Sequence, residues 1–327
     1  MKEQRLERIG HLDGWRGIAI LLVLIAHFTN FSYFNEGRFG VDIFFVLSGM
    51  LMSNILFVKR TPLPLFYWRW ASRIVPVFLL FVFSIYTFSY FSDMHFSTTE
   101  LLSTLAFTRT YLPTEVGIWS SNVPIGHIWS LNVEEHSYII LSLITLPYFI
   151  RKKEGYLLIL LGIITIFIYI YYMKNPATSP KNYALRTECA ASYIFLSAGY
   201  FLIKDRFTPY IKSWFPLMSM MLAVFCYSEI APWWSSFLVA PFLLAFTVNH
   251  LTEAATIFKM VLSFTPLRYL GVWSYSIYLW QQPFYKFKNA FPEGVGLAIA
   301  LSIGVTSFYL FENPTREWIN SLYNNNK

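Results

Sequence analysis

The feature that most constrains the fold is a succession of long apolar segments, with charged residues gathered between the segments rather than inside them. Charged residues make up only 13% of the chain and hydrophobic residues 56%, whereas soluble proteins average roughly 25% charged residues. A soluble domain of 327 residues could not cover so much apolar side chain with a polar surface. The sequence therefore predicts an all-α integral membrane protein.

About ten transmembrane helices are expected when these segments are cut at clusters of charge, proline and glycine, because about 20 residues cross a hydrocarbon core of roughly 30 Å. They lie near residues 14–34, 39–58, 74–92, 127–149, 156–173, 188–203, 214–230, 233–250, 268–288 and 294–312. The interval 93–126 is the longest polar one, and its leucine pattern predicts a helix along the extracytoplasmic membrane surface. We expect residues 1–13 to form a short cytoplasmic tail and residues 1–327 to form a single membrane domain, with no soluble domain appended.

Lysine and arginine residues are unevenly distributed over the two sides of this arrangement. With a cytoplasmic N-terminus, 18 of the 25 fall on the cytoplasmic side. The seven on the other side are Arg38, Arg109, Lys174, Lys181, Arg186, Lys286 and Lys288. This positive-inside bias predicts that both termini are cytoplasmic. It also accounts for the net charge of +7 without a nucleic-acid partner, and the isolated Cys189 and Cys226 indicate neither a disulfide framework nor a metal site.

Arg16 and His27 are the sharpest pair of polar groups in an expected span. They are 11 residues apart, which is almost three helical turns, so both project from one face about 16 Å apart along the axis. Arg16 should lie at the cytoplasmic interface and His27 in the outer half of the membrane. Two plainer interpretations stay open: Arg16 as an interfacial anchor, and His27 as a structural hydrogen-bond partner of a neighbouring span.

Three other polar residues are expected at the same membrane depth as His27, namely Glu134, Glu135 and Gln281. Their depth follows from a rise of about 1.5 Å per residue along each expected helix. A carboxylate beside the histidine would orient its ring, which is the arrangement that a general base uses to take a hydroxyl proton. Glu134 and Glu135 are the candidates for that carboxylate. Asp42 is a further one, and its pairing with Arg38 one helical turn earlier is an equal alternative.

Arginines gather at the inner ends of the spans, at Arg16, Arg69, Arg73, Arg268 and Arg316. Guanidinium groups bind phosphate oxygens in bidentate fashion. This group therefore predicts a site for a polyphosphate-bearing cofactor at the cytoplasmic mouth. Each arginine alone also fits the role of a topology determinant.

Six segments carry a family resemblance: HLDGWRGIAILLVLIAH at His11–His27, FGVDIFFVLSGMLM at Phe39–Met52, FYWRWASRIVP at Phe66–Pro76, WSLNVEEHSY at Trp129–Tyr138, SYSIYLWQQP at Ser274–Pro283 and FENPTREW at Phe311–Trp318. The first, with an arginine and a histidine separated by ten residues, closely resembles the opening signature of the acyltransferase-3 family of membrane O-acyltransferases. The other five are similar to later segments of that family, in the same order. The resemblance runs almost from end to end.

The resemblance implies an enzyme of the bacterial cytoplasmic membrane. It would take an acyl group, usually acetyl, from acyl-CoA on the cytoplasmic side and deliver it to a carbohydrate hydroxyl on the other side. His27 would be the catalytic base, with Glu135, Glu134 and Asp42 as the acidic groups near it. The donor acetyl-CoA is then expected at Arg16, Asp13, Arg69, Arg73 and Arg268, and the acceptor is expected to be oriented by Gln281, Tyr278, Ser274 and Trp129. No metal is implied.

Several positions depart from the family's segments. Trp68, Trp70 and Ser72 stand where basic residues are frequent, so we expect the contacts to the donor phosphates to be rearranged. Gln281 stands where the family usually has histidine. Because glutamine cannot carry a proton away, we expect it to orient the substrate rather than to act as an acid or base. His136 stands where the family often has glutamine.

Some alternatives stay open from the sequence. The acyl group could pass directly or through an acyl-enzyme at Ser48, Ser130, Ser274, Tyr275 or Tyr278, and succinyl or another acyl group could replace acetyl. Transfer is expected in the membrane domain or on a separate partner, and the possible partners are a separate extracytoplasmic transferase or a second copy of the chain in a homo-oligomer. The acceptor glycan is not identified. A transporter of an anionic or acylated sugar intermediate is the alternative function, and it would move its cargo without consuming a thioester.

Overall fold

The computed structural model describes residues 10–29 and 34–325. Within these ranges every regular element is helical, and the one β contact is an isolated antiparallel bridge between Phe34 and Ser228. The predicted all-α class is therefore confirmed. The α-helices are α1 (Gly10–Phe28), α2 (Glu36–Ser53), α3 (Leu63–Phe91), α4 (Thr98–Leu105), α5 (Trp129–Ile144), α6 (Glu154–Lys174), α7 (Thr187–Ala190), α8 (Ser192–Ile203), α9 (Phe215–Phe225), α10 (Ser235–Leu238), α11 (Ala240–Asn249), α12 (Thr256–Leu262), α13 (Thr265–Lys286), α14 (Val295–Ser307) and α15 (Asn313–Asn325).

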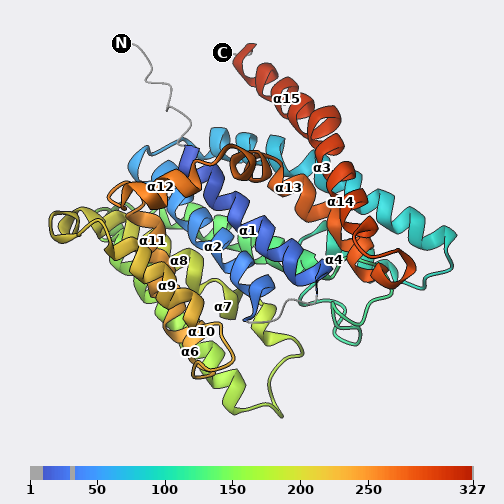
Figure 1. Cartoon of the computed structure of the whole chain (residues 1–327), viewed down its shortest axis with the longest axis horizontal. Helices are drawn as coiled ribbons and strands as arrows, with labels where there is room; N and C mark the ends of the chain where they lie inside the picture. Colours follow the sequence, from blue (N-terminus) through green and yellow to red (C-terminus); the bar gives the residue numbers. More distant parts are fainter. Residues whose placement is uncertain (1–9, 30–33, 326–327) are drawn as a thin grey trace.

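Helices α1, α2 and α13 form the centre of the molecule (Figure 1). Trp15 of α1 donates its indole N–H to the carbonyl of Ile43 in α2 at 3.0 Å. A glycine allows close approach on the other side of α1, because a Cβ on Gly271 of α13 would lie 1.8 Å from the carbonyl oxygen of Asp13. Small residues at such crossings are typical of membrane helices. Since α1 packs against both partners, its side chains can reach sites shared with each.

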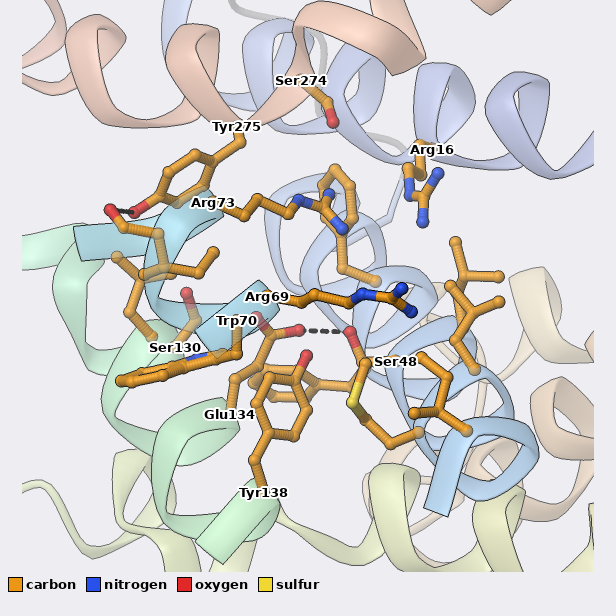
Figure 2. A pocket seen from close by; sticks show the side chains of 18 of the residues that line it. Arg16, Ser48, Arg69, Trp70, Arg73, Ser130, Glu134, Tyr138, Ser274 and Tyr275 are labelled. Atoms are coloured by element: carbon orange, nitrogen blue, oxygen red, sulfur yellow. Dashed lines mark hydrogen bonds between the residues drawn. The ribbon is translucent and has the colours of Figure 1, made fainter. Parts of the chain in front are cut away.

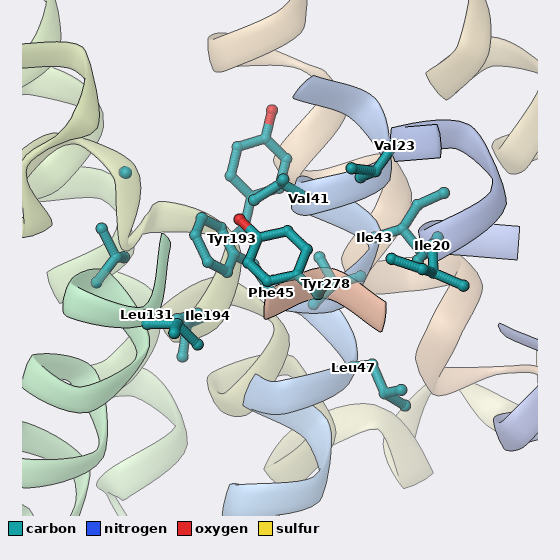
Figure 3. Packing of buried hydrophobic residues seen from close by; sticks show 14 of the residues in the cluster. Ile20, Val23, Val41, Ile43, Phe45, Leu47, Leu131, Tyr193, Ile194 and Tyr278 are labelled. Carbon is teal, nitrogen blue, oxygen red and sulfur yellow. The ribbon is translucent and has the colours of Figure 1, made fainter. Parts of the chain in front are cut away.

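The remaining helices flank this centre. Figure 1 shows α6, α8, α9, α10 and α11 on one flank and α3, α4, α14 and α15 on the other. Helix α5 packs against α2 and α7. Buried residues of α1, α2, α5, α8 and α13 belong to a common apolar cluster, part of which is drawn in Figure 3.

Five helical segments are long and apolar enough to cross a membrane: Gly10–Phe28, Glu36–Val58, Leu63–Phe91, Glu154–Lys174 and Val295–Tyr323. Two further apolar helices, α9 and α11, are shorter. Length and composition thus support a membrane protein. The expectation of about ten spans and the side on which the termini lie stay predictions.

The helix of the third predicted span, 74–92, begins earlier than that span. Helix α3 begins at Leu63, and Pro64 lies in its first turn, where the missing proline N–H removes no intrahelical hydrogen bond. The charges of Arg69 and Arg73 set the predicted boundary, and both residues are exposed as well as lining a cavity. The helix therefore extends beyond the apolar run that defined the predicted span.

Other predicted spans are interrupted or extended. The span 188–203 breaks between α7 and α8, and the span 233–250 breaks between α10 and α11. Helix α2 continues through a π-helical turn, η1 (Asn54–Val58), and α14 passes through η8 (Phe308–Glu312) into α15. The last predicted span, 294–312, therefore extends into α15. Turns of this π-helical kind are rare in proteins, and those that occur are often found near functional sites.

The polar interval 93–126 folds around α4 and a buried ion pair. Helix α4 starts with a capping box, in which Ser97 and Glu100 each accept a hydrogen bond from the other's backbone N–H. The Glu100 carboxylate also accepts a hydrogen bond of 2.7 Å from Arg109, whose side chain is 1% exposed. Tyr111 donates to Glu188 of α7 at 2.6 Å, and burial raises the pKa of Tyr111 to about 12. These contacts hold the interval against α7, and its location at a membrane surface stays a prediction.

Candidate functional site

One cavity of about 410 Å³ is lined by Arg16 of α1 and by Arg69 and Arg73 of α3, and both α3 arginines are exposed. We call it the arginine cavity. Figure 2 shows the three guanidinium groups extending into the same space from two helices, α1 and α3. Its remaining walls come from α2, η1, α5 and α13, and Lys59 is a further basic residue in the lining. An excess of positive charge around a cavity favours an anionic ligand.

Two acidic groups accompany these arginines. Glu134 of α5 lines the arginine cavity, where Ser48 donates a hydrogen bond of 2.6 Å to its carboxylate (Figure 2). Asp13 lies in a smaller adjoining pocket of about 230 Å³, which shares Arg16 and Arg73 with the arginine cavity. Asp13 and Arg16 form an ion pair at 3.2 Å. The predicted donor residues Asp13, Arg16, Arg69 and Arg73 therefore lie in one connected region.

A second cavity, of about 1010 Å³, contains His27 near the other end of α1. We call it the histidine cavity. Aromatic side chains dominate its wall, namely Phe34, Trp119, Trp129, Tyr169, Tyr193, Tyr227, Phe237, Tyr278 and Tyr285. Its charged residues are Glu36, Arg38, Asp42 and Glu229. Within the described residues, no group of three or more His, Cys, Asp or Glu side chains is arranged to hold a metal ion.

His27 is held by an amide. Its Nδ1 lies 2.7 Å from Oε1 of Gln281, and Nε2 of that amide points to the carbonyl of Tyr278 at 3.4 Å. Because an amide oxygen only accepts, the proton of the neutral imidazole belongs on Nδ1. The ring also stacks on Tyr285, with centroids 4.0 Å apart. This arrangement leaves Nε2 with a lone pair, which is what a general base requires.

The structure does not bring the predicted carboxylates to His27. Glu134 faces the arginine cavity instead. Glu135 is buried, has an Oε1 without a hydrogen-bond partner among the described residues, and is absent from the described lining of both cavities. Counting the rise along a helix gives depth alone, whereas the direction of a side chain around the axis depends on how the helix packs.

Asp42 lies in the wall of the histidine cavity, but its partner is a guanidinium. Arg38 Nε is 3.0 Å from an Asp42 oxygen that also accepts a hydrogen bond of 2.7 Å from Tyr227. Of the two alternatives that the sequence left open, the structure contains the Arg38 ion pair. The guanidinium of Arg38 also lies 4.9 Å from the ring centre of Trp129.

The other predicted site residues divide between the two cavities. Ser274 lines the arginine cavity, Trp129 lines the histidine cavity, and Tyr278 lines both. Arg268 does not join them. Arg268 lies at the start of α13, beside Gly10 of α1. It is not part of the arginine-cavity lining in the described chain.

Sequence reasoning missed His127 in the short turn η2 (Gly126–Ile128). This residue is 2% exposed and lines the histidine cavity, and neither of its ring nitrogens has a hydrogen-bond partner within the described residues. The sequence marked it only as the start of a span. Tyr193 and Tyr227 were missed because they reach the cavity from segments far from His27 in the chain.

Within the described residues, the helical body, its five helices long and apolar enough to cross a membrane, and its two cavities indicate a polytopic membrane protein. The chain belongs to the acyltransferase-3 family: residues 9–313 match the sequence model of that family, which is described as an acyltransferase domain. The resemblance inferred from the six segments is therefore confirmed.

Curated relatives match nearly the whole chain. "Peptidoglycan O-acetyltransferase OatA" of Listeria monocytogenes serovar 1/2a is 27% identical over 347 residues, covering 94% of this chain and 55% of that protein. "Putative peptidoglycan O-acetyltransferase YrhL" of Bacillus subtilis strain 168 is 26% identical over 355 residues, covering 96% of this chain and 56% of that protein. "Putative O-acetyltransferase SACOL0978" of Staphylococcus aureus strain COL is 26% identical over 376 residues, covering 97% of this chain and 58% of that protein. The chain thus spans about half the length of the curated relatives it matches. No solved structure matches it.

Proposed function

We propose that the chain is an O-acyltransferase of the bacterial cytoplasmic membrane. It transfers an acyl group, acetyl in the simplest case, from acyl-CoA in the arginine cavity to a carbohydrate hydroxyl in the histidine cavity. Family membership and the O-acetyltransferase names of the relatives support the reaction class. The observation that carries the proposal is the contact of His27 Nδ1 with Gln281 at 2.7 Å, which leaves Nε2 free to act as a base.

The donor binds through its phosphates. Arg16, Arg69 and Arg73 offer planar guanidinium groups, which suit phosphate oxygens better than ammonium groups do. Arg16 and His27 belong to one helix. A donor held at Arg16 is proposed to extend along α1, with its acyl end toward His27.

The acceptor binds among the aromatic side chains of the histidine cavity. Aromatic faces pack against the apolar faces of sugar rings, while the Arg38–Asp42 pair supplies hydrogen-bond donors and acceptors for hydroxyl groups. Peptidoglycan is named as the substrate of two relatives, and a glycan of that chemistry is the acceptor we propose.

Transfer is direct in this proposal. His27 Nε2 takes the hydroxyl proton while the hydroxyl oxygen attacks the thioester carbonyl. The carbon–sulfur bond then breaks, the acyl group remains on the acceptor as an ester, and the imidazolium returns its proton to the CoA thiolate. No further co-reactant is needed.

The test uses purified protein in detergent with acetyl-CoA and tetra-N-acetylglucosamine as the acceptor probe. We expect CoA release together with acetylated sugar detected by mass spectrometry. Replacing His27 by Ala should lower the rate about 10²- to 10⁴-fold, since it removes the base. His95→Ala is the matched control, because this exposed histidine lies in the interval 93–126.

Retained CoA release in correctly folded His27→Ala protein would overturn the base assignment. A wild-type protein that releases no CoA from acetyl-CoA, but moves an anionic sugar across vesicles, would instead support the transporter.

A further inference from the structure

The two cavities are neighbours with a shared part of their walls. Their linings share two described residues, Val41 of α2 and Tyr278 of α13. Tyr278 is the larger of the two, and it belongs to the buried apolar cluster of Figure 3. A group that passes between the cavities along their shared boundary must therefore pass the Tyr278 ring.

Hydrogen bonds hold this ring in position. The phenol of Tyr278 donates to the carbonyl of His127 at 2.9 Å and lies 2.6 Å from Ser130 Oγ. Both partners belong to the segment that starts α5, opposite α13. The phenol thus bridges from α13 to that segment across the boundary.

Packing restricts the ring further. Its centroid lies 6.5 Å from that of Phe44 in an edge-on arrangement and 5.1 Å from that of His127. Tyr278 is 7% exposed. Little room remains beside the ring for a chain of methylene groups, because buried side chains pack at nearly crystal density.

We propose that Tyr278 is the partition between the donor and acceptor cavities and that its ring limits the length of the acyl group delivered to His27. This inference rests on the proposed function. The thioester must come within reach of His27 while the phosphates stay at the arginines, so the acyl end of the donor meets the partition. A short acyl group passes beside the ring, and a longer one is obstructed.

Two substitutions distinguish the role of the Tyr278 ring from the role of its hydroxyl group. Tyr278→Ala removes the ring, whereas Tyr278→Phe keeps the ring and removes the hydrogen bonds to Ser130 and His127. Tyr275→Ala is the matched control, because Tyr275 lies one turn earlier on α13 and lines the arginine cavity but not the described histidine cavity. A general loosening of α13 would affect Tyr275→Ala and Tyr278→Ala alike.

The first measurement compares acetyl-CoA with hexanoyl-CoA, using CoA release with tetra-N-acetylglucosamine. We expect Tyr278→Ala to raise the hexanoyl-to-acetyl ratio of kcat/KM by about tenfold or more, which is the size of discrimination a few methylene groups give. Tyr278→Phe and Tyr275→Ala should keep the wild-type ratio. An unchanged ratio in Tyr278→Ala would overturn the limit on acyl length.

The second measurement needs no catalysis. Ser236 lines the histidine cavity only, so Ser236→Cys in a Cys189→Ala, Cys226→Ala background provides a small thiol there. A charged methanethiosulfonate reagent is added to sealed vesicles on the side where Lys59 lies. We expect Tyr278→Ala to be labelled about tenfold faster or more than the same protein with Tyr278 intact.

Equal labelling rates with and without Tyr278 would overturn the partition. If acetyl-CoA is not consumed by the wild type, the proposed function fails, yet the labelling rates still decide whether Tyr278 separates the cavities. The two failures are thus distinguishable.

Discussion

At the scale of single residues, the site orients its histidine with a neutral amide. Gln281 is fully buried and contacts His27 at 2.7 Å. A carboxylate in that position would stabilise the imidazolium that forms when the base accepts a proton. An amide fixes the ring without that stabilisation, which in the proposed reaction would favour return of the proton to the leaving thiolate.

Substitution of Gln281 tests this orientation. Gln281→Leu removes the acceptor for Nδ1–H, and we expect kcat for CoA release to fall about 10²-fold or more because the reactive tautomer is no longer selected. Gln281→Glu keeps an acceptor oxygen and should retain more activity than the leucine variant. Equal activity of the two variants would contradict the orienting role, and Gln282→Leu on the same helix controls for the loss of a buried amide.

At the scale of elements, close contact between α1 and α13 aligns the two halves of the site. Arg16 and His27 belong to α1, while Tyr278 and Gln281 belong to α13. The helices approach so closely at Gly271 that no side chain fits there. A shift between them would alter the contacts of His27 and the boundary between the cavities together.

Gly271→Ala should therefore destabilise the protein and reduce its activity. The added Cβ would lie 1.8 Å from the Asp13 carbonyl oxygen, and overpacking of this kind costs about 1–3 kcal/mol or more. We expect a lower Tm in detergent by scanning fluorimetry. Gly296→Ala in α14 is the matched control, because the nearest atom to its Cβ would lie 3.6 Å away. Equal Tm values for the two variants would contradict the close packing of α1 against α13 at Gly271.

At the scale of the whole molecule, the arginine cavity and the histidine cavity are arranged along α1. The positive-inside bias of the sequence assigns the arginine cavity to the cytoplasmic side, where acyl-CoA is available. Under this predicted orientation, the proposed reaction would carry the acyl group from the cytoplasmic to the extracytoplasmic side. It also gives a testable orientation for segments outside the spans.

Topology reporters test that orientation. Alkaline phosphatase inserted after Lys181 should be active, since that segment is predicted to be extracytoplasmic, and the same insertion after Arg206 should be inactive. A fluorescent protein fused after Lys327 should fluoresce, as expected for a cytoplasmic C-terminus. The opposite pattern of phosphatase activity would show that the predicted orientation is inverted.

The sequence by itself determined the class of fold and the family. Its apolar content requires burial in lipid, and a 3.6-residue repeat is enough to assign Arg16 and His27 to one helix. The order of the six segments then carried the family resemblance. These properties depend only on composition and on local sequence. They can therefore be inferred without knowing which residues are in contact.

Tertiary structure alone decided which groups meet. His27 and Gln281 are 254 positions apart in the chain, and the sequence could give their common depth but not their contact. Packing turned Glu134 toward the arginines, paired Asp42 with Arg38, left Arg268 outside the arginine cavity and brought His127 into the histidine cavity. The physical reason is that the rotation of each helix about its axis depends on its neighbours, whereas depth follows from the rise per residue alone.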